Sequence, residues 1–473
     1  MSSTEHDLIV VGGGSGGIGA ARVARFRDVS VAIVQDGPLG GDCTWTGCVP
    51  SKALLAAAAA GTSFDEAMAT VQSAVQTIAG HETAEALAEE GIDVIAGRGV
   101  LTGPREVTVD GVVHRARIAV IVSPGSAPLL PPIDGLDQVG ALTNEEIWSL
   151  PSLPARLAII GGGPIGMEMA QAFTRMGSSV TVVEGASRVM PRDDADAAAV
   201  VHRVLSAEGV DIRTGVFASS VRREDAGTVH LELADGTVHL ELADGSVVEA
   251  DQLLVAAGRR PAHASMGLEE VGVKMTDRGW IEVDEHLQTA VDGVYAIGDA
   301  VGDRQFTHAA GHMAWLAVEN ALARGMRRFS KHSYDPGNIP WVTFTSPEVA
   351  QVGVTEAEAA DIDGAVVAEL PLAELDRAVA VGRTDGFVKL ISVPRRGLGM
   401  TGGGRLIGAT IVADRAGELA GEAALAVRTG MFAGRLAQTV HAYPTWSIAL
   451  QMAAAQLVGE YGGRTARPPR RDA

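Results

Sequence analysis

The 473-residue chain contains only two cysteines, and this scarcity limits its chemistry. Two thiols in so long a chain exclude a disulfide scaffold and a zinc site with four cysteine ligands. Long apolar runs are missing as well, since the longest bland stretch, residues 53–60, is far too short to cross a bilayer. The N-terminus has no basic segment before its first apolar run, so we expect no secretory signal, no contact with a membrane and a cytoplasmic location.

Basic residues are scarce too. The chain has 38 basic and 58 acidic side chains, a formal net charge of −20, which disfavours nucleic acid as a partner. Glycine is abundant instead, with 58 residues and no collagen period. This abundance fits tight turns whose backbone N–H groups bind phosphate without help from lysine or arginine. The length favours about three domains, and the hydrophobic content of 47% allows each a substantial core.

Two glycine-rich turns lie in matching surroundings. Each follows a buried apolar strand, at 8–11 and 157–160, and leads into a helix of small residues and then a second strand. Glycine permits the tight turn, lets the backbone approach a diphosphate, and lets the helix pack on the strand. One such turn is weak evidence, but two copies in the same context predict two bound dinucleotides. The glycines are Gly12, Gly14 and Gly17 in the first turn and Gly161, Gly163 and Gly166 in the second.

The residue at the end of the second strand of each unit bears on which nucleotide binds. An acidic residue at this position usually binds ribose hydroxyls. Glu184 occupies it in the second unit, and its charge would repel a 2′-phosphate, so NADH is favoured over NADPH, although the nearby Arg188 weakens this inference. The first unit has Gln35 there, followed by Asp36. An amide still hydrogen-bonds to a hydroxyl, so we expect weaker ribose binding rather than none.

Both cysteines lie in one short segment, residues 40–52, with the sequence GGDCTWTGCVPSK. Such close spacing favours a redox pair over two unrelated thiols. In a regular helix, residues five apart point about 140° away from each other, so a Cys43–Cys48 disulfide requires an interrupted backbone, which Gly47 makes possible. Lys52 lies one turn after Cys48 on the same face, where a cation can lower the pKa of a thiol or polarise a neighbouring ring.

The segment GGDCTWTGCVPSK resembles the redox motif of the pyridine nucleotide-disulfide oxidoreductases, the family of dihydrolipoamide dehydrogenase, glutathione reductase and mercuric reductase. Three further segments resemble motifs of this family, in the family's order. They are the turn that closes the NAD domain at 255–261 (VAAGRRP), the second FAD motif at 289–299 (TAVDGVYAIGD) and the opening of the dimerisation domain at 339–353 (IPWVTFTSPEVAQVG). The resemblance covers nearly the whole chain and is nearest to proteins similar to mercuric reductase and dihydrolipoamide dehydrogenase.

The resemblance implies an α/β fold with two Rossmann-like dinucleotide-binding domains, for FAD and NAD, and a C-terminal α+β dimerisation domain. The implied order is the first part of the FAD-binding domain at 1–150, the NAD(P)H-binding domain at 151–275, the second part of the FAD-binding domain at 276–335 and the dimerisation domain at 336–461. We expect a homodimer. We also expect residues 462–473, which are rich in arginine and proline, to form a disordered tail.

The resemblance also implies an electron path from NADH through FAD and the Cys43–Cys48 disulfide to an acceptor. By motif position, Cys48 faces the flavin, Cys43 exchanges with the substrate, and Lys52 lies near the flavin N5 edge, paired with Glu168. A Lys–Glu pair there gives the electron-accepting ring an ionised, polar environment; an ordinary ion pair between domains is the alternative for Glu168. The expected cofactor-binding residues are Gly12, Gly14, Gly17, Gln35, Asp36, Gly41, Asp42, Lys52, Ser123, Gly125, Gly161, Gly163, Gly166, Glu184, Gly258, Asp299 and His308.

The acid–base dyad of the family's disulfide reductases is missing. In those enzymes a His before Pro-Thr pairs with a Glu five residues on, whereas this chain has Tyr443 and Ile448 at the two positions. A phenol with a pKa of about 10 donates a proton but is a poor base at neutral pH. His441, two residues before Tyr443, replaces the missing base only if the loop is shifted, and a purely structural role for it is equally open. We therefore expect weak turnover of lipoamide or glutathione disulfide.

The sequence leaves the electron acceptor open. A tyrosine at position 443 resembles mercuric reductase, but the chain lacks that enzyme's C-terminal cysteine pair and N-terminal metal-binding module, so mercury reduction is disfavoured. A disulfide, a quinone or another metal ion stays open as the small-molecule acceptor, and no resident metal site is predicted. Two alternatives stand beside this interpretation. One is a diaphorase or transhydrogenase that does not use the cysteines, and the other is a non-catalytic redox sensor or subunit of a complex.

A tandem repeat is the remaining unusual feature. Residues 228–236 and 237–245 are both TVHLELADG. Each copy alternates like a strand and ends in Asp-Gly, a hairpin turn signal, so we expect a β-meander with one added hairpin. The repeat is too short for a solenoid, and we assign it no function.

Overall fold

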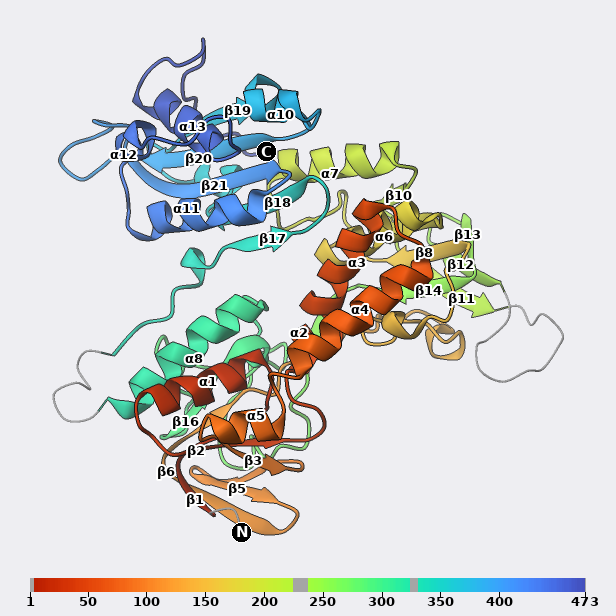
Figure 1. Ribbon diagram of the computed structural model, residues 1–473, viewed down its shortest axis with the longest axis vertical. Helices are drawn as coiled ribbons and strands as arrows, with labels where there is room; N and C mark the ends of the chain where they lie inside the picture. Colours follow the sequence, from red (N-terminus) through yellow and green to blue (C-terminus); the bar gives the residue numbers. More distant parts are fainter. Residues whose placement is uncertain (1–3, 224–236, 324–330, 473) are drawn as a thin grey trace.

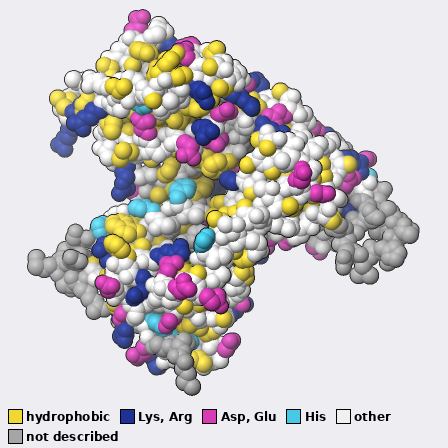
Figure 2. Space-filling view, in the orientation of Figure 1, with side chains coloured by type: hydrophobic (Ala, Val, Ile, Leu, Met, Phe, Trp, Pro, Cys, Tyr) yellow, Lys and Arg dark blue, Asp and Glu magenta, His cyan; other side chains and the backbone are white. Residues whose placement is uncertain are grey.

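The computed structural model describes residues 4–223, 237–323 and 331–472, which form three α/β regions (Figure 1). No helix among these residues is long and apolar enough to cross a membrane. On the face shown in Figure 2, the described Lys and Arg side chains lie among acidic ones.

The first region is built on a seven-stranded sheet. Its parallel part has the order β3-β2-β1-β6, with β16 on the far side of β6, and an antiparallel extension adds β5 and β4. The central strands are covered on both faces, and Leu8, Ile9 and Val10 are fully buried, which explains their continuous apolar run. The strands are β1 (Glu5–Val11), β2 (Val31–Gln35), β3 (Asp93–Ala96), β4 (Val100–Gly103), β5 (Glu106–Val109), β6 (Val112–Val122) and β16 (Val294–Ala296).

The helices of the first region come from two distant parts of the chain. Helices α1 and α8 lie side by side on the sheet (Figure 1), so residues after 276 complete the layer that the N-terminus begins. Residues 64–89 form two helices, α4 and α5, and the first of them is capped by Gly80. The helices are α1 (Ser15–Phe26), α2 (Gly41–Trp45), α3 (Cys48–Ala60), α4 (Phe64–Ala79), α5 (Ala84–Glu89) and α8 (Thr307–Leu322).

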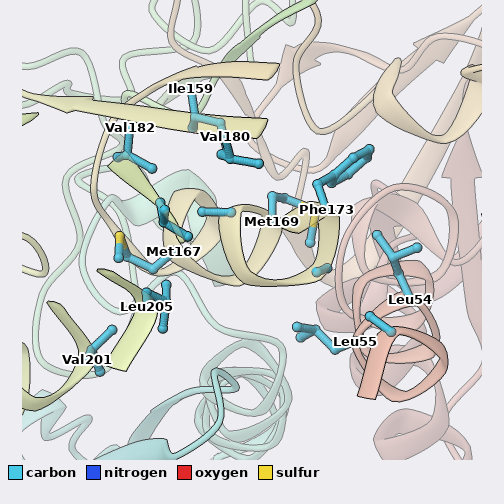
Figure 3. Packing of buried hydrophobic residues seen from close by; sticks show 14 of the residues in the cluster. Leu54, Leu55, Ile159, Met167, Met169, Phe173, Val180, Val182, Val201 and Leu205 are labelled. Carbon is cyan, nitrogen blue, oxygen red and sulfur yellow. The ribbon is translucent and has the colours of Figure 1, made fainter. Parts of the chain in front are cut away.

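Helix α3, which carries Cys48 at its first position, is held by both nucleotide-binding regions. Leu54 and Leu55 on α3 pack in one core cluster with Met169 and Phe173 of α6 (Pro164–Met176), as Figure 3 shows. Large buried side chains of this kind each contribute about 2 kcal/mol or more to stability. The redox helix is therefore a shared, rigid part of the boundary between the first and second regions.

The second region repeats the nucleotide-binding design. A parallel sheet has the order β10-β9-β8-β14, and an antiparallel meander has the order β11-β12-β13. A short two-stranded pair, β7 (Ser126–Pro128) with β15 (Arg259–Pro261), joins it back to the first region. The remaining elements are β8 (Arg156–Ile160), β9 (Ser179–Glu184), α7 (Ala195–Ala207), β10 (Asp211–Thr214), β11 (Ala218–Arg223), β12 (Val238–Leu242), β13 (Val247–Ala250) and β14 (Gln252–Val255).

The second copy of the tandem repeat forms a strand and a turn, as its alternation predicts. Its apolar residues Val238, Leu240 and Leu242 are buried on one face of β12, and its Ala-Asp-Gly ending makes the turn into β13. The first copy, residues 228–236, lies outside the described residues.

The third region is a five-stranded antiparallel sheet in the order β17-β18-β21-β20-β19. Small residues along α11 and α13 allow these helices to pack closely on it. Its elements are β17 (Trp341–Thr343), β18 (Glu348–Gly353), α9 (Glu356–Ala359), β19 (Val366–Pro371), α10 (Asp376–Ala380), β20 (Phe387–Val393), β21 (Arg405–Ala413), α11 (Ala416–Arg428), α12 (Ala433–Gln438) and α13 (Ile448–Val458).

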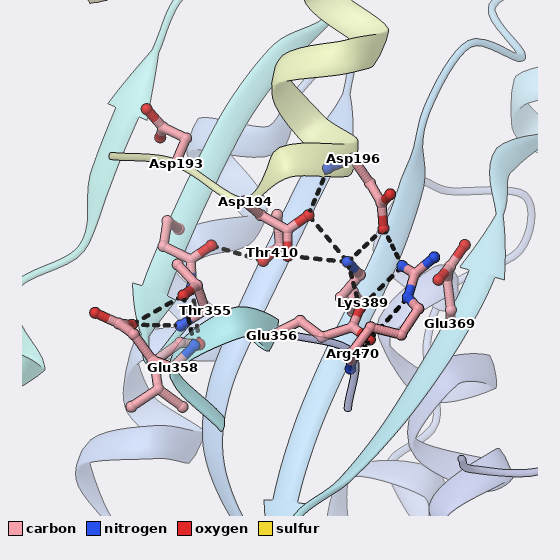
Figure 4. A network of polar contacts seen from close by, with 12 residues as sticks. Asp193, Asp194, Asp196, Thr355, Glu356, Glu358, Glu369, Lys389, Thr410 and Arg470 are labelled. Carbon is pink, nitrogen blue, oxygen red and sulfur yellow. Dashed lines mark hydrogen bonds and ion pairs between the residues drawn. The ribbon is translucent and has the colours of Figure 1, made fainter. Parts of the chain in front are cut away.

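The C-terminal tail differs from the disordered end that we expect from its composition. Arg467 exchanges two backbone hydrogen bonds with Val367, at 2.7 and 2.8 Å. The Arg467 and Arg470 side chains bind the fully buried carboxylate of Glu356. The fully buried Lys389 also contacts this carboxylate, at 2.7 Å, and Figure 4 shows Lys389 and Arg470 beside Glu356. A buried carboxylate is costly without cations. The two arginines lie more than a hundred residues after Glu356 in the chain, so tail composition alone could not reveal these contacts.

Candidate active site

The two glycine-rich turns have nearly the same geometry. Gly12 has φ +108° and Gly161 has φ +110°, a region that only glycine adopts easily. A Cβ on Gly17 would lie 1.8 Å from the carbonyl oxygen of Gly12, and a Cβ on Gly166 would lie 1.9 Å from that of Gly161. Each spacing therefore has a steric reason, because any larger residue would force the helix off the strand.

Both turns leave room and hydrogen-bond donors for a diphosphate. Gly14 and Gly163 precede α1 and α6, and neither helix has a side-chain cap, so first-turn N–H groups stay available. Gly163 has no neighbour within 4 Å of a Cβ position. Gly41 lies against the first turn, since its Cβ would be 2.8 Å from the Cα of Gly14. The residues thus fit one dinucleotide at each turn.

Gln35 and Glu184 make the same contact in their two units. The Gly13 N–H donates to Gln35 Oε1 at 2.6 Å, and the Gly162 N–H donates to Glu184 Oε2 at 2.7 Å. Asp36, next to Gln35, is exposed. Gln35 therefore stabilises the first turn in the way that Glu184 stabilises the second. Gln35 Oε1 and Glu184 Oε2 each keep a lone pair that can accept a hydrogen bond from a ribose hydroxyl.

Arg188, which weakens the sequence argument for NADH, is occupied elsewhere. Its guanidinium donates to the backbone carbonyls of Met190, Pro191 and Asp193 at 2.8, 3.0 and 2.8 Å. These bonds hold the loop after β9 and use three of the five N–H donors of the guanidinium.

The redox segment is two short helices separated at Gly47. Helix α2 ends at Trp45 and α3 begins at Cys48, so the cysteines are not on one continuous helix. A Cβ on Gly47 would lie 2.9 Å from the carbonyl oxygen of Asp42 and 3.4 Å from the Cα of Cys43. Gly47 thus allows the close approach of the two helices that brings the thiols together.

The two thiols have different acidities. Cys43 and Cys48 are free cysteines whose side chains hydrogen-bond to each other, and Cys48 Sγ lies 3.4 Å from Thr307 Oγ1 at the start of α8. The hydrogen bond from Cys43 lowers the pKa of Cys48 to about 6, with help from Thr307 and Lys52, although burial opposes the shift. The same contact and burial raise the pKa of Cys43. Cys48 is the thiolate of the pair at neutral pH.

Lys52 forms the ion pair that the resemblance implies. Its Nζ donates to Glu168 Oε2 at 2.9 Å and Oε1 at 3.2 Å, and it lies 4.4 Å from the centroid of the Phe344 ring. Glu168, on α6, is buried and also accepts the Phe344 N–H at 2.9 Å. The pair therefore joins all three regions one turn along α3 from Cys48. Its part in catalysis stays a prediction.

Asp42 and Asp299, both expected at FAD, share a partner that sequence reasoning missed. Arg259 Nη2 lies 2.5 Å from Asp42 Oδ2, and Arg259 Nε lies 3.6 Å from Asp299 Oδ2. Ser126 Oγ donates to Asp299 at 2.6 Å. The sequence feature that could have indicated this role for Arg259 is its position in the segment VAAGRRP, directly after Gly258.

The structure also describes the surroundings of the other residues that we expect to bind a cofactor. Gly125 and Gly258 adopt φ +75° and +126°, and the carbonyl oxygen of Ser123 lies 2.1 Å from the Cβ position of Gly12, which fits closely packed backbone around the first turn. His308 Nε2 contacts the carbonyl oxygen of Pro340 at 2.6 Å. The binding roles of these residues stay predictions.

The residues around the missing dyad lie in the third region. Tyr443 is 69% exposed and its hydroxyl donates to Asp376 at 2.7 Å, which raises the pKa of the phenol. The side chain of His441 is only 5% exposed; Nε2 lies 2.9 Å from Glu422 and Nδ1 lies 2.9 Å from the carbonyl oxygen of Thr439. Within one chain the structure brings neither residue to the cysteines.

Comparisons with known proteins agree with this architecture. The family model for the pyridine nucleotide-disulphide oxidoreductases matches residues 6–314, and the model for the dimerisation domain of these proteins matches residues 339–454. The chain belongs to this family. It is an FAD-dependent oxidoreductase, and its dimerisation domain supports a homodimer.

Named relatives cover almost the whole chain. It is 35% identical to a dihydrolipoyl dehydrogenase from Synechocystis over 95% of this chain and 98% of that one, and 36% identical to a mercuric reductase from Streptomyces lividans over 96% of each. Among solved structures it resembles the Cu(II) complex of the HOCl-induced flavoprotein disulfide reductase RclA from Escherichia coli (TM-score 0.84, 27% identity, 96% and 99% coverage). It also resembles LpdA from Mycobacterium tuberculosis (TM-score 0.84, 30% identity, 95% and 99% coverage).

Proposed function

We propose that the protein oxidises NADH and passes the electrons through FAD and the Cys43–Cys48 pair to an acceptor that needs no thiol–disulfide exchange, namely a quinone or a metal ion. The observation that carries this proposal is the loss of the acid–base dyad at Tyr443 and Ile448. Reduction of a disulfide substrate needs a group that protonates the departing thiolate. A quinone or metal ion needs no such leaving group.

Tyr443 is a poor substitute for a histidine. Its hydrogen bond to Asp376 raises the pKa of the phenol, so the tyrosinate is even scarcer at neutral pH than for a free tyrosine. Ile448, at the start of α13, has no titratable group. The two positions together supply no base to a neighbouring thiol.

His441 does not fill the gap in this conformation. Each of its ring nitrogens faces an oxygen acceptor, the carboxylate of Glu422 or the carbonyl of Thr439. Neither nitrogen has a free lone pair directed at a substrate, and the ring is buried. These contacts favour a structural role for His441.

The chain's own residues support two-electron chemistry at the cysteines. A bound FAD would supply the electron pair, taken from the nicotinamide as a hydride. Reduction of the Cys43–Cys48 disulfide takes two electrons, breaks the S–S bond and needs only one proton when Cys48 stays a thiolate, as its low pKa favours. Lys52, held by Glu168, places a fixed cation close to that thiolate.

NADH is the preferred reductant in this proposal. Glu184 ends the second strand of the unit, where an acidic residue usually binds ribose hydroxyls and would repel a 2′-phosphate, and the Arg188 guanidinium is held by three carbonyls. Phosphate recognition normally relies on free, charge-assisted donors.

A metal ion that acts as the electron acceptor would have to be reduced at the Cys43–Cys48 pair. Among the described residues, one group of three carboxylates lies close enough to hold an ion, at Asp196, Glu356 and Glu369, and Lys389 and the tail arginines already neutralise it. The similarity to RclA, whose structure contains Cu(II), makes Cu(II) the first metal ion to test.

The test is a panel of acceptors with NADH, using a water-soluble naphthoquinone, Cu(II), lipoamide and glutathione disulfide. We expect the quinone or Cu(II) to exceed both disulfides in kcat/KM by about 100-fold or more, since general acid–base help is worth about 10²–10⁴-fold. The Cys43→Ser, Cys48→Ser double variant is the control. If it keeps the full rate, the cysteines are bypassed, as in a diaphorase; if NADH is consumed only once, the protein is a sensor.

A further inference from the structure

Arg259 occupies an unusual place between the nucleotide-binding regions. It starts β15, the strand that leaves the second region and pairs with β7 of the first. Its side chain is only 14% exposed, and its donors are directed at groups of the first region. Besides the two carboxylates, it donates from Nε to Ser126 Oγ at 2.5 Å and from Nη2 to the Ser126 carbonyl at 3.0 Å.

Its two carboxylate partners come from separate parts of the FAD-binding architecture. Asp42 lies on α2, directly before Cys43, and also accepts hydrogen bonds from Thr46 and Asn144. Asp299 lies in a short helical turn after β16, some 250 residues further along the chain. Arg259 is thus the one group, among the described residues, that contacts both carboxylates.

The charges at this point require a cation. Burial raises the pKa of Asp299, and the neighbouring Asp42 raises it further, while Ser126 and Arg259 oppose the shift. Without Arg259 the two partly exposed carboxylates would repel each other, and Asp299 would lose the cation beside it.

We propose that Arg259 is a positioning residue of the FAD site, and that its guanidinium fastens the Asp42–Cys43 end of the redox segment to the Asp299 segment. The first glycine turn is close by, because Gly41 packs against Gly14. The contacts of Arg259 therefore fix the position of the thiol pair relative to the FAD-binding residues, across the boundary between the first and second regions. They do not depend on which acceptor the enzyme uses.

The first test measures FAD affinity, with apoprotein and flavin fluorescence quenching. We expect Arg259→Met to raise the Kd for FAD by about 30-fold or more, because it removes the cation from a partly buried cluster of charges. Arg259→Lys, which keeps the charge, should recover part of the loss. Two controls are matched: Arg260→Met changes the exposed neighbour, and Arg156→Met removes a different ion pair, with Asp251 at 2.8 Å. Both controls should keep the wild-type Kd within about threefold.

The second test measures the reactivity of Cys43, which lies next to Asp42. In reduced apoprotein that carries Cys48→Ser, so that Cys43 is the thiol that reacts, Arg259→Met and Asp42→Asn should each speed alkylation by iodoacetamide several-fold, because each releases the start of α2. The double variant should be far less than additive for both Kd and alkylation rate, since the two side chains act as one pair. Additive effects, or an Arg259→Met protein that behaves like Arg260→Met, overturn the proposal. If Arg259→Met does not fold, Arg259→Lys and Asp42→Asn decide it by alkylation alone: unchanged rates overturn it.

Discussion

Restoring the missing dyad is the most direct challenge to the proposed function. The change is Tyr443→His with Ile448→Glu, which recreates the His-Pro-Thr and Glu spacing of the family's disulfide reductases. We expect the double variant to reduce lipoamide with a kcat/KM about 10–100 times that of the wild type. This range lies at or below the lower end of the usual gain from general acid–base catalysis, because the surrounding pocket is not adapted to the new pair.

The structure indicates that the protein tolerates both changes. Tyr443 is largely exposed and loses one surface hydrogen bond to Asp376, which should change the stability little. Ile448 is partly buried, so its replacement costs about 1 kcal/mol of apolar contact. A glutamate in the first turn of α13 recovers about 0.5 kcal/mol through the helix dipole. The net cost is small enough that a negative result cannot be ascribed to unfolding.

The assay compares NADH-dependent reduction of lipoamide and of a naphthoquinone at pH 6 to 8. Tyr443→Phe is the control, because it removes the hydroxyl without adding a base, and it should leave both rates near those of the wild type. The gain should appear only for lipoamide. An unchanged lipoamide rate in a folded, dimeric double variant contradicts the reasoning, as does a wild-type lipoamide rate equal to its best quinone rate.

Three further outcomes are expected. Partial reduction should give a long-wavelength charge-transfer band between the Cys48 thiolate and the flavin. Its intensity should fall as the pH drops through about 6; Cys48→Ser should abolish it, and Cys43→Ala should move its midpoint to higher pH by removing the hydrogen bond. NADH should exceed NADPH in kcat/KM, and Glu184→Ala should narrow the ratio; a wild-type preference for NADPH contradicts the assignment. Removing residues 467–473 should destabilise the protein by about 2 kcal/mol at pH 7, since the arginines are partly exposed. Burial raises the pKa of Glu356, but hydrogen bonds from its cations bring it well below the usual range, so this stabilisation is present above about pH 4.5 and lost as the pH falls. Equal melting of full-length and shortened protein at pH 7 excludes this role for the tail.

The sequence by itself determined the features that follow from local backbone rules. The glycine spacing at residues 12–17 and 161–166 predicts the turns because a Cβ on Gly17 or Gly166 would collide with the carbonyl oxygen of the glycine that opens the same turn. Gly47, between the cysteines, marks the break between two short helices for the same reason. The strands and helices of both nucleotide-binding units were predicted closely because their apolar patterns are strong and continuous.

Tertiary structure decided what depends on charges far apart in the chain. No local pattern indicates that Arg259 neutralises Asp42 and Asp299, because the partners lie in three separate segments that only the packed sheets bring together. The tail was predicted wrongly for the same reason: its composition is typical of a disordered end, yet a fully buried Glu356 a hundred residues earlier requires its arginines. Steric rules act between neighbours in sequence, whereas the cost of burying a charge is set by whatever the fold places beside it.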